Sequence, residues 1–404
     1  MKRKRTRDEC PVWLLLALNA FLYISSALYS PFLSAYYTQN GLSPSEIGIL
    51  MCVGPVASVL IQPLWARASD ASGKAKTFAA LVMAGTALSL LTYYLGHSFG
   101  GFLFSSVLLA LFSTSVNPMT DAIVIRNANR YHYNFAIIRM GGTVGYAVVV
   151  LLAGIYLRRY PAAQFFLAAA SYLALMGFVL IMPRQENRLP VSPPSGREES
   201  RRKAAFLRLG DIFEDKKVVY VLAFAFVFQV GASFCSAFLG VYAVELGYGQ
   251  SQIGLLNCIS ASSEIPILLG IRKLTRKFGA LHLIAASTFL MGIRLFLVSG
   301  GSLPFFMLAQ AMQGVTYMVV HFGCATFIGG CVKSGKSFQG QSVLYIIQAG
   351  LASIVGNVLG GRLADLASNR LSYRLTGGFV LLAAAIVIFA LYMQERKERR
   401  SPLS

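Results

Sequence analysis

The sequence predicts an all-α membrane protein with twelve transmembrane helices in two six-helix repeats. Twelve long apolar stretches fill most of the chain, and one charged segment separates the first six from the last six. A helix needs about 20 apolar residues to cross a bilayer core, and each stretch is close to that length. Composition agrees, because 56% of the 404 residues are hydrophobic and only 13% are charged. Soluble proteins usually carry about 25% charged residues.

The expected spans are the apolar runs between charged or glycine-containing connections. They cover residues 12–37, 45–67, 77–95, 101–125, 135–157, 163–182, 218–243, 251–270, 280–299, 304–331, 340–361 and 374–394. The first run is longer than the apolar region of a signal peptide, so we expect it to remain as the first transmembrane helix.

The basic residues predict the orientation of these spans. Of the 36 Lys and Arg residues, 29 lie in the N-terminal segment or in connections on its side of the membrane, and five lie on the other side. By the positive-inside rule, we expect a cell-membrane protein with both termini in the cytoplasm. Topology and lipid headgroups then explain the net charge of +20, so we expect no nucleic-acid partner.

One long connection, 183–217, divides the chain into an N-terminal half, 1–182, and a C-terminal half, 218–404. It contains four prolines and a basic run, which is typical of a cytoplasmic linker. Within it, Arg202 to Phe213 fits an amphipathic surface helix.

The two halves share a sequence repeat. Gly41–Leu50 and Gly247–Leu256 have the same Gly, Ser, Ile, Gly and Leu at an offset of 206, and this offset also relates Gly73 to Gly279. Parallel repeats of this kind are found in secondary transporters.

Four charged side chains lie well inside the expected spans. They are Asp121 in the fourth, Arg139 in the fifth, Glu264 in the eighth and Arg294 in the ninth. A charge at this depth costs at least about 2.5 kcal/mol on insertion scales, so each one needs a reason. Their distances from the connections predict that Asp121 pairs with Arg139 and Glu264 with Arg294. Two plainer explanations stay open: Arg139 could snorkel to the interface, and the second pair could be structural.

Polar side chains form stripes on several expected spans. In the tenth span, one helix face carries Gln310, Gln313, Gly314, Tyr317, His321 and Cys324. Stripes on other spans include Asn19, Tyr23, Asn117, Gln229 and Asn257. Taken singly, each stripe could serve hydrogen bonding between helices. Together they predict a central cavity whose aromatic rings and amides suit a small polar organic ligand.

Sequence motifs give no support to an enzyme. The sequence has no HExxH or GxSxG motif, and its cysteines form no CxxC pair. Residues 330–337 match the phosphate-binding pattern GxxxxGK[ST], but they follow an expected membrane span instead of a strand. We therefore expect no enzymatic activity, no cofactor and no metal.

The loop after the second span resembles the signature loop of the major facilitator superfamily. Asp70, Gly73, Lys74 and Lys76 fit the pattern G-x-L-x-D-x-x-G-[RK]-x-[RK], whereas alanines replace its leading glycine and the basic residue after the aspartate. In that family the loop gates the cytoplasmic side. The resemblance therefore implies a gating role for Asp70, Gly73 and Lys74.

Motifs within the spans resemble the phenylpropionate-permease-like branch, which is related to the oligosaccharide–proton symporters such as lactose permease. The matching segments are 41–48, 117–121, 139–145, 263–266 and 310–314, together with His321. The resemblance places Asp121 and Arg139 at the sugar-binding acid and arginine of that permease. The resemblance also places Glu264 at the acid in span eight of lactose permease, Arg294 at the arginine in span nine and His321 at the histidine in span ten.

One position departs from that family. Cys324 and Ala325 occupy the helical turn in which lactose permease has a proton-carrying acid. If the protein is a proton symporter, Glu264 or Asp121 must carry the proton.

We therefore expect a monomeric secondary transporter that works by alternating access in the lipid bilayer. The expected reaction is proton-coupled symport of a sugar, a nucleoside or an aromatic acid. Proton coupling is assigned to Glu264, Arg294, His321 and Asp121. Substrate binding is assigned to Asp121, Arg139, Asn19, Tyr23, Asn117, Gln229, Asn257, Gln313 and Tyr317. A uniporter, an exporter, another coupling ion and a non-transporting membrane sensor remain as alternatives.

Overall fold

The computed structural model describes residues 11–182, 216–331 and 337–400. Within these ranges, twelve helices are long and apolar enough to cross a membrane, which confirms the predicted all-α architecture. The surface helix expected at Arg202–Phe213 lies outside the described residues, as do most of the expected linker and part of the segment 330–337.

The first six spans are built from ten helical segments. These are α1 (Val12–Ala27), η1 (Ser30–Phe32), α2 (Leu33–Gln39), α3 (Pro44–Leu60), α4 (Gln62–Ser72), α5 (Ala75–Leu91), η2 (Thr92–Tyr94), α6 (Phe99–Arg130), α7 (Phe135–Leu157) and α8 (Ala163–Ile181).

The last six spans follow the expected linker. They consist of α10 (Lys216–Glu245), α11 (Gln250–Phe278), α12 (Ala280–Ser299), α13 (Leu303–Ala311), η4 (Gly314–Met318), α14 (Val319–Cys331), α15 (Ser337–Tyr345), η5 (Ile346–Ala352), α16 (Ser353–Leu366) and α17 (Asn369–Arg400).

Two of these segments are π-helical, and both lie inside spans of the C-terminal half. Segment η4 interrupts the tenth span and η5 interrupts the eleventh. Short π-helical turns are rare and are often found at functional sites.

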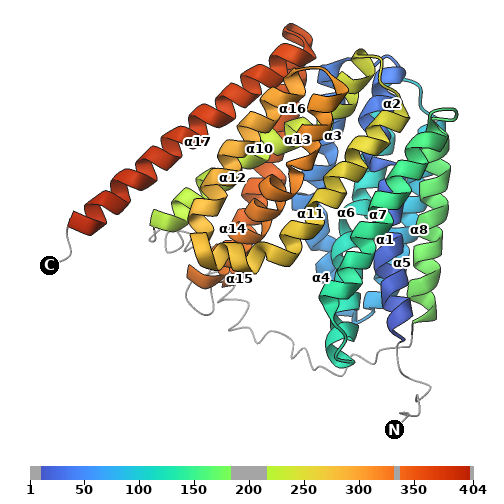
Figure 1. Ribbon diagram of the computed structural model, residues 1–404. Helices are drawn as coiled ribbons and strands as arrows, with labels where there is room; N and C mark the ends of the chain where they lie inside the picture. The colour runs from blue at the N-terminus through green and yellow to red at the C-terminus, as the bar shows by residue number, and fades with distance from the viewer. Residues whose placement is uncertain (1–10, 183–215, 332–336, 401–404) are drawn as a thin grey trace.

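The helices cross the bundle between two ends. Helix α1 begins and α17 ends at one end, which we call the proximal end; α2 ends and α3 begins at the opposite, distal end (Figure 1).

The sequence repeat has the same local structure in both halves at the distal end. Gly41 and Gly247 have φ values of +82° and +81°, a conformation that favours glycine. In the first copy, Glu46 Oε2 accepts a hydrogen bond of 2.9 Å from the backbone N–H of Ser43. In the second, Gln252 accepts one of 3.0 Å from the backbone N–H of Gly249. Both copies therefore use the same turn and helix start.

At the distal end, α3 of the first half crosses α16 of the second at a pair of glycines. A Cβ atom on Gly48 would lie 2.5 Å from the carbonyl oxygen of Asn357, and one on Gly361 would lie 2.6 Å from that of Pro44. Only glycine allows the two backbones to approach so closely.

A second crossing joins α7 to α11 by the same means. A Cβ atom on Gly154 would lie 2.7 Å from the carbonyl oxygen of Gln250, and one on Gly254 would lie 2.7 Å from that of Val150. Gly254 is the repeat counterpart of Gly48, and Gly361 follows Gly154 at nearly the same offset. Two repeat-related crossings thus hold the halves together at the distal end.

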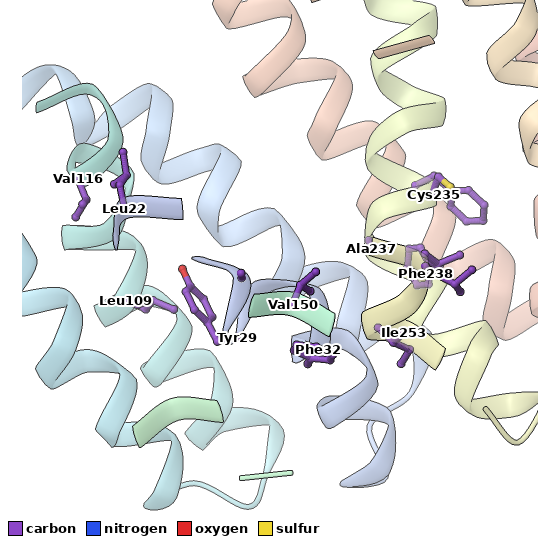
Figure 2. Packing of buried hydrophobic residues seen from close by; sticks show 14 of the residues in the cluster. Leu22, Tyr29, Phe32, Leu109, Val116, Val150, Cys235, Ala237, Phe238 and Ile253 are labelled. Carbon is purple, nitrogen blue, oxygen red and sulfur yellow. The ribbon is translucent and has the colours of Figure 1, made fainter. Parts of the chain in front are cut away.

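An apolar seal lies beside these crossings. Phe32 of η1, Val150 of α7 and Ile253 of α11 are buried and belong to one hydrophobic cluster that extends through both halves. Figure 2 shows these three side chains close together where helices of the two halves meet. We call these three residues the apolar seal.

Candidate substrate and coupling site

The first part of the site is an ion pair within the N-terminal half. Arg139 of α7 lies 3.8 Å from Asp121 of α6, measured from Nη1 to Oδ2. The side chains are 35% and 29% exposed, so both can be reached from the space beside them. Asp121 and Arg139 were predicted to pair because they lie at similar depth in their spans, and the structure brings them together.

Helix α1 adds an aromatic ring and an amide to this pair. The guanidinium of Arg139 lies over the ring of Tyr23, 5.5 Å from the centroid, in a cation–π arrangement. Gly142 of α7 makes room for both α1 side chains, because a Cβ atom there would overlap Asn19 Oδ1 and the Tyr23 ring. Asn19 is 0% exposed, and neither amide atom has a hydrogen-bond partner in the described part of the chain.

The second part of the site surrounds Arg294 of α12. The residue as a whole is only 4% exposed. Its Nη2 donates a hydrogen bond of 2.6 Å to Gln310 Oε1, and its Nη1 donates to Gln313 Oε1. The two glutamine amides replace the water that a buried guanidinium has lost.

The expected direct pair of Glu264 with Arg294 is not formed. Among the described residues, no ion pair joins these two side chains, and the two Nη groups of Arg294 donate to Gln310 and Gln313 instead. Glu264 is instead in polar contact with Gln313 and interacts electrostatically with Arg139 and Arg294. Since Gln313 Oε1 already accepts from Arg294, its NH2 group is what remains for the carboxylate. Gln313 thus bridges the acid and the buried arginine.

A glycine contact holds this bridge in place. The backbone N–H of Gly314 donates a hydrogen bond of 3.0 Å to Ser263 Oγ. A Cβ atom on Gly314 would overlap the carbonyl oxygen of Ser263, so η4 lies directly on α11. Since Gln313 precedes Gly314 and Glu264 follows Ser263, this contact places the amide beside the acid.

The two parts of the site interact across the boundary between the halves. Arg139 of the N-terminal half acts electrostatically on Glu264 and on His321 of the C-terminal half. Tyr146 of α7 also interacts with Glu264, although it is not among the residues predicted from the sequence. Tyr146 lies two helical turns after Arg139, so the spacing of seven residues is a signal that identifies it.

Tyr317 and His321 form an aromatic pair at the accessible side of the tenth span. Their rings are parallel within 11°, with centroids 5.6 Å apart, and the imidazole is exposed. The expected stripe does not continue to Cys324, which is fully buried in the hydrophobic cluster. The prediction assumed regular α-helix, whereas the π-helical segment η4 rotates the residues that follow it.

Three expected binding residues lie apart from this arrangement or make local contacts. Gln229 Nε2 donates a hydrogen bond of 3.1 Å to Ser353 Oγ between two helices. Asn257 Nδ2 donates to the carbonyl of Ile253 in its own helix, at 2.9 Å. Asn117 is exposed, one helical turn before Asp121. A hydrogen bond between helices therefore explains the polar side chain of Gln229, and one within its own helix explains that of Asn257.

The expected gating loop lines a separate cavity in the N-terminal half. Gly73 ends α4 in the left-handed conformation, with φ +64°. Asp70, Gly73 and Lys74 border a cavity of about 640 Å³ that is also lined by residues of α5, α6 and α8. The nearby Lys76 Nζ donates to the carbonyl oxygens of Leu180 and Met182, which ties α5 to the end of α8.

A comparison with protein families assigns the chain. The model of the MFS_1 like family matches residues 13–375, which is most of the sequence. The chain belongs to the MFS_1 like family. It is therefore a multi-pass membrane transporter of the major facilitator superfamily and not an enzyme, as the signature loop and the span pattern predicted.

Three named relatives of this MFS_1 like protein are distant in sequence. The "Uncharacterized transporter YwbF" of Bacillus subtilis (strain 168) is 26% identical over 66% of this chain, which spans 65% of that relative's length. The "Maltose permease" of Geobacillus stearothermophilus is 26% identical over 91% of both chains. The "Probable 3-phenylpropionic acid transporter" of Escherichia coli (strain K12) is 25% identical over 78% of this chain and 81% of its own.

The fold is also that of solved transporters. The crystal structure of the nucleoside transporter NupG superimposes with a TM-score of 0.76. It covers 93% of this chain and 98% of its own, at 15% sequence identity. This likeness establishes the major facilitator fold of the MFS_1 like protein.

Proposed function

We propose that this transporter carries a small polar organic substrate together with a proton and works by alternating access. The observation that carries the proposal is the position of Glu264. It is a membrane-embedded acid that contacts Gln313 in its own half and is attracted to Arg139 in the other. A change in its protonation state acts on both halves at once.

Glu264 is the proposed proton carrier. As a carboxylate it accepts from the Gln313 amide and attracts Arg139; as a carboxylic acid it loses its charge and both attractions weaken. Arg294 then keeps its two glutamine partners, so the buried cation stays solvated in either state. Protonation therefore weakens the link between the halves, while the hydrogen bonds from Arg294 to its two glutamines persist.

The substrate is proposed to bind beside Asp121 and Arg139, between the halves. Tyr23 and Tyr317 supply aromatic surface there, and the partly exposed Arg139 and Asp121 side chains supply a donor and an acceptor. The printed names of the relatives, which include maltose and 3-phenylpropionic acid, support a small organic substrate of this size.

Alternating access is proposed to use the two glycine crossings. In the described state these crossings and the apolar seal close the distal end. The asymmetry of Lys and Arg supports a cytoplasmic proximal end, so this state faces the cytoplasm. Parting of the crossings then opens the site to the outside, as the two halves rock about it.

The test is substrate-induced proton entry into proteoliposomes of the purified protein. The panel contains disaccharides, nucleosides and aromatic acids, and a pH electrode records the external solution. Alkalinisation with one substrate is the expected result and identifies the class. Substrate uptake that is unchanged when the proton gradient is collapsed contradicts proton coupling, and a folded protein that takes up nothing contradicts transport of these classes.

A further inference from the structure

We infer that the site selects uncharged polar substrates and rejects carboxylates, because Gln310 and Gln313 withdraw Arg294 from it. This inference rests on the proposed function and narrows its substrate class. It separates the sugars and nucleosides, which are neutral polyhydroxylated compounds, from the aromatic acids.

The accessible charges of the site are unequal. Arg139 and Asp121 are both partly exposed, and they neutralise each other. Glu264 is also partly exposed and has no ion-pair partner among the described residues. Arg294 is buried, and both of its Nη groups are bound by amide oxygens. A substrate thus meets two carboxylates and one guanidinium.

A carboxylate substrate gains little from such a site. The charge of the Arg139 guanidinium is offset by Asp121, 3.8 Å away, so an anion has to compete with that carboxylate for it. The like charges of Asp121 and Glu264 oppose the anion. Protonation of Glu264 removes one of them but adds no positive group.

A neutral hydroxyl-bearing substrate matches the same groups. Each hydroxyl both donates and accepts, so neighbouring hydroxyls can donate to Asp121 and accept from Arg139. Asp121 Oδ1 and both amide atoms of Asn19 are buried without a hydrogen-bond partner in the described ranges. Because these atoms have almost no accessible surface, a hydroxylated ring meets the partly exposed parts of the Arg139 and Asp121 side chains instead.

The two sources of such a ring are a glycoside and a nucleoside, and the uptake panel distinguishes them. Their shared chemistry gives a second expectation. With one protonated Glu264 and a neutral substrate, each cycle carries one positive charge, so uptake should be electrogenic.

The experiment compares ligands that have the same shape and differ in charge. The wild-type protein in detergent at pH 7.5 is titrated with glucose against glucuronate, and with 3-phenylpropionamide against 3-phenylpropionate. Thermal stabilisation of the protein reports binding. The neutral member of a pair should bind at least about tenfold more tightly than the acid.

A variant tests the role assigned to the glutamines. Gln313→Met removes the acceptor for Arg294 Nη1 at nearly the same volume, so the preference for the neutral ligand should fall several-fold. Gln341→Met is the matched control, because the Gln341 amide donates to the carbonyl of Ala325 and not to the site. Its preference should equal that of the wild type.

The outcomes separate this inference from the proposed function. An acid that binds as tightly as its neutral partner overturns the inference, and so does binding by neither neutral ligand. Equal preferences in Gln313→Met and Gln341→Met overturn the role of the glutamines. Proton entry with an aromatic acid in the uptake assay supports the proposed function while overturning the inference.

Discussion

Gly314 of η4 lies directly on Ser263 of α11, backbone against backbone. The N–H of Gly314 donates to Ser263 Oγ, and its Cα has no room for a side chain. This contact fixes the separation of the two residues beside it, Gln313 and Glu264. A change at a position with no functional group should therefore alter the chemistry of the site.

Gly314→Ala tests that relationship. The added methyl group meets a carbonyl oxygen, so η4 has to move away from α11, at a cost of about 1–3 kcal/mol. We expect a lower melting temperature in a thermal unfolding assay and slower proton-coupled uptake. Gly270→Ala, in the facing helix α11, is the control, since a Cβ there meets nothing within 4 Å. If both variants lose melting temperature and uptake rate equally, the contact between Gly314 and Ser263 has no special role, because any glycine-to-alanine change in these helices would have the same effect.

Glu264→Gln tests the proton carrier. The amide keeps the size of the side chain but cannot gain or lose a proton, so the attraction to Arg139 no longer changes during the cycle. We expect proton-driven accumulation to fall to the level of facilitated diffusion, while exchange of labelled for unlabelled substrate continues. Glu245→Gln, at the distal end, should retain accumulation. Accumulation by Glu264→Gln at the wild-type level would assign the proton to another group.

Gly48→Leu tests the closure of the distal end. The leucine side chain cannot fit against the backbone of Asn357, so the α3–α16 crossing should be held apart. We expect spin labels on the distal ends of α3 and α16 to report longer distances and uptake to stop. Gly54→Leu in the same helix is the control, because a Cβ at Gly54 meets nothing within 4 Å. Unchanged distances in Gly48→Leu would mean that the crossing is not the gate.

Asp365→Asn tests an electrostatic contact at the same crossing. Asp365 Oδ2 of α16 accepts a hydrogen bond of 2.9 Å from the N–H of Ser45, in the first turn of α3. A negative charge at a helix N-terminus contributes about 0.3–1 kcal/mol. The fraction of molecules open at the distal end should therefore rise by about two- to fivefold in the same label measurement. Glu245→Gln is again the control, since Glu245 binds Asn369 within its own half.

The fold could be predicted from the sequence to a large extent. Spans of about 20 apolar residues leave few alternatives to membrane helices, and the repeat of Gly41 at Gly247 indicated the duplicated turn. The π-helical segments could not be predicted, because they arise from packing. Gly314 permits the close contact with Ser263, but a glycine at that position is equally compatible with regular α-helix.

The site could be predicted only in part. Counting residues from each connection gave the depth of a charge, and depth sufficed for Asp121 and Arg139 because their helices bring them within 3.8 Å. Depth does not give the rotation of a helix about its axis. The sequence therefore did not predict that Arg294 donates to two glutamines of the neighbouring span instead of pairing with Glu264.

The paired glycines at the distal end have a consequence for ancestry. Gly48 and Gly154 of the first half recur as Gly254 and Gly361 of the second. Gly48 lies against Gly361 in one crossing and Gly154 lies against Gly254 in the other, so each crossing joins two different positions of the repeat. A six-helix ancestor with these two glycines could close against a second copy of itself through both crossings, before the genes were fused. Asp365 has Arg158 as its counterpart at the offset of the second glycine pair, and an arginine cannot accept the equivalent hydrogen bond from the start of α11, so the charged contact is present in one crossing only.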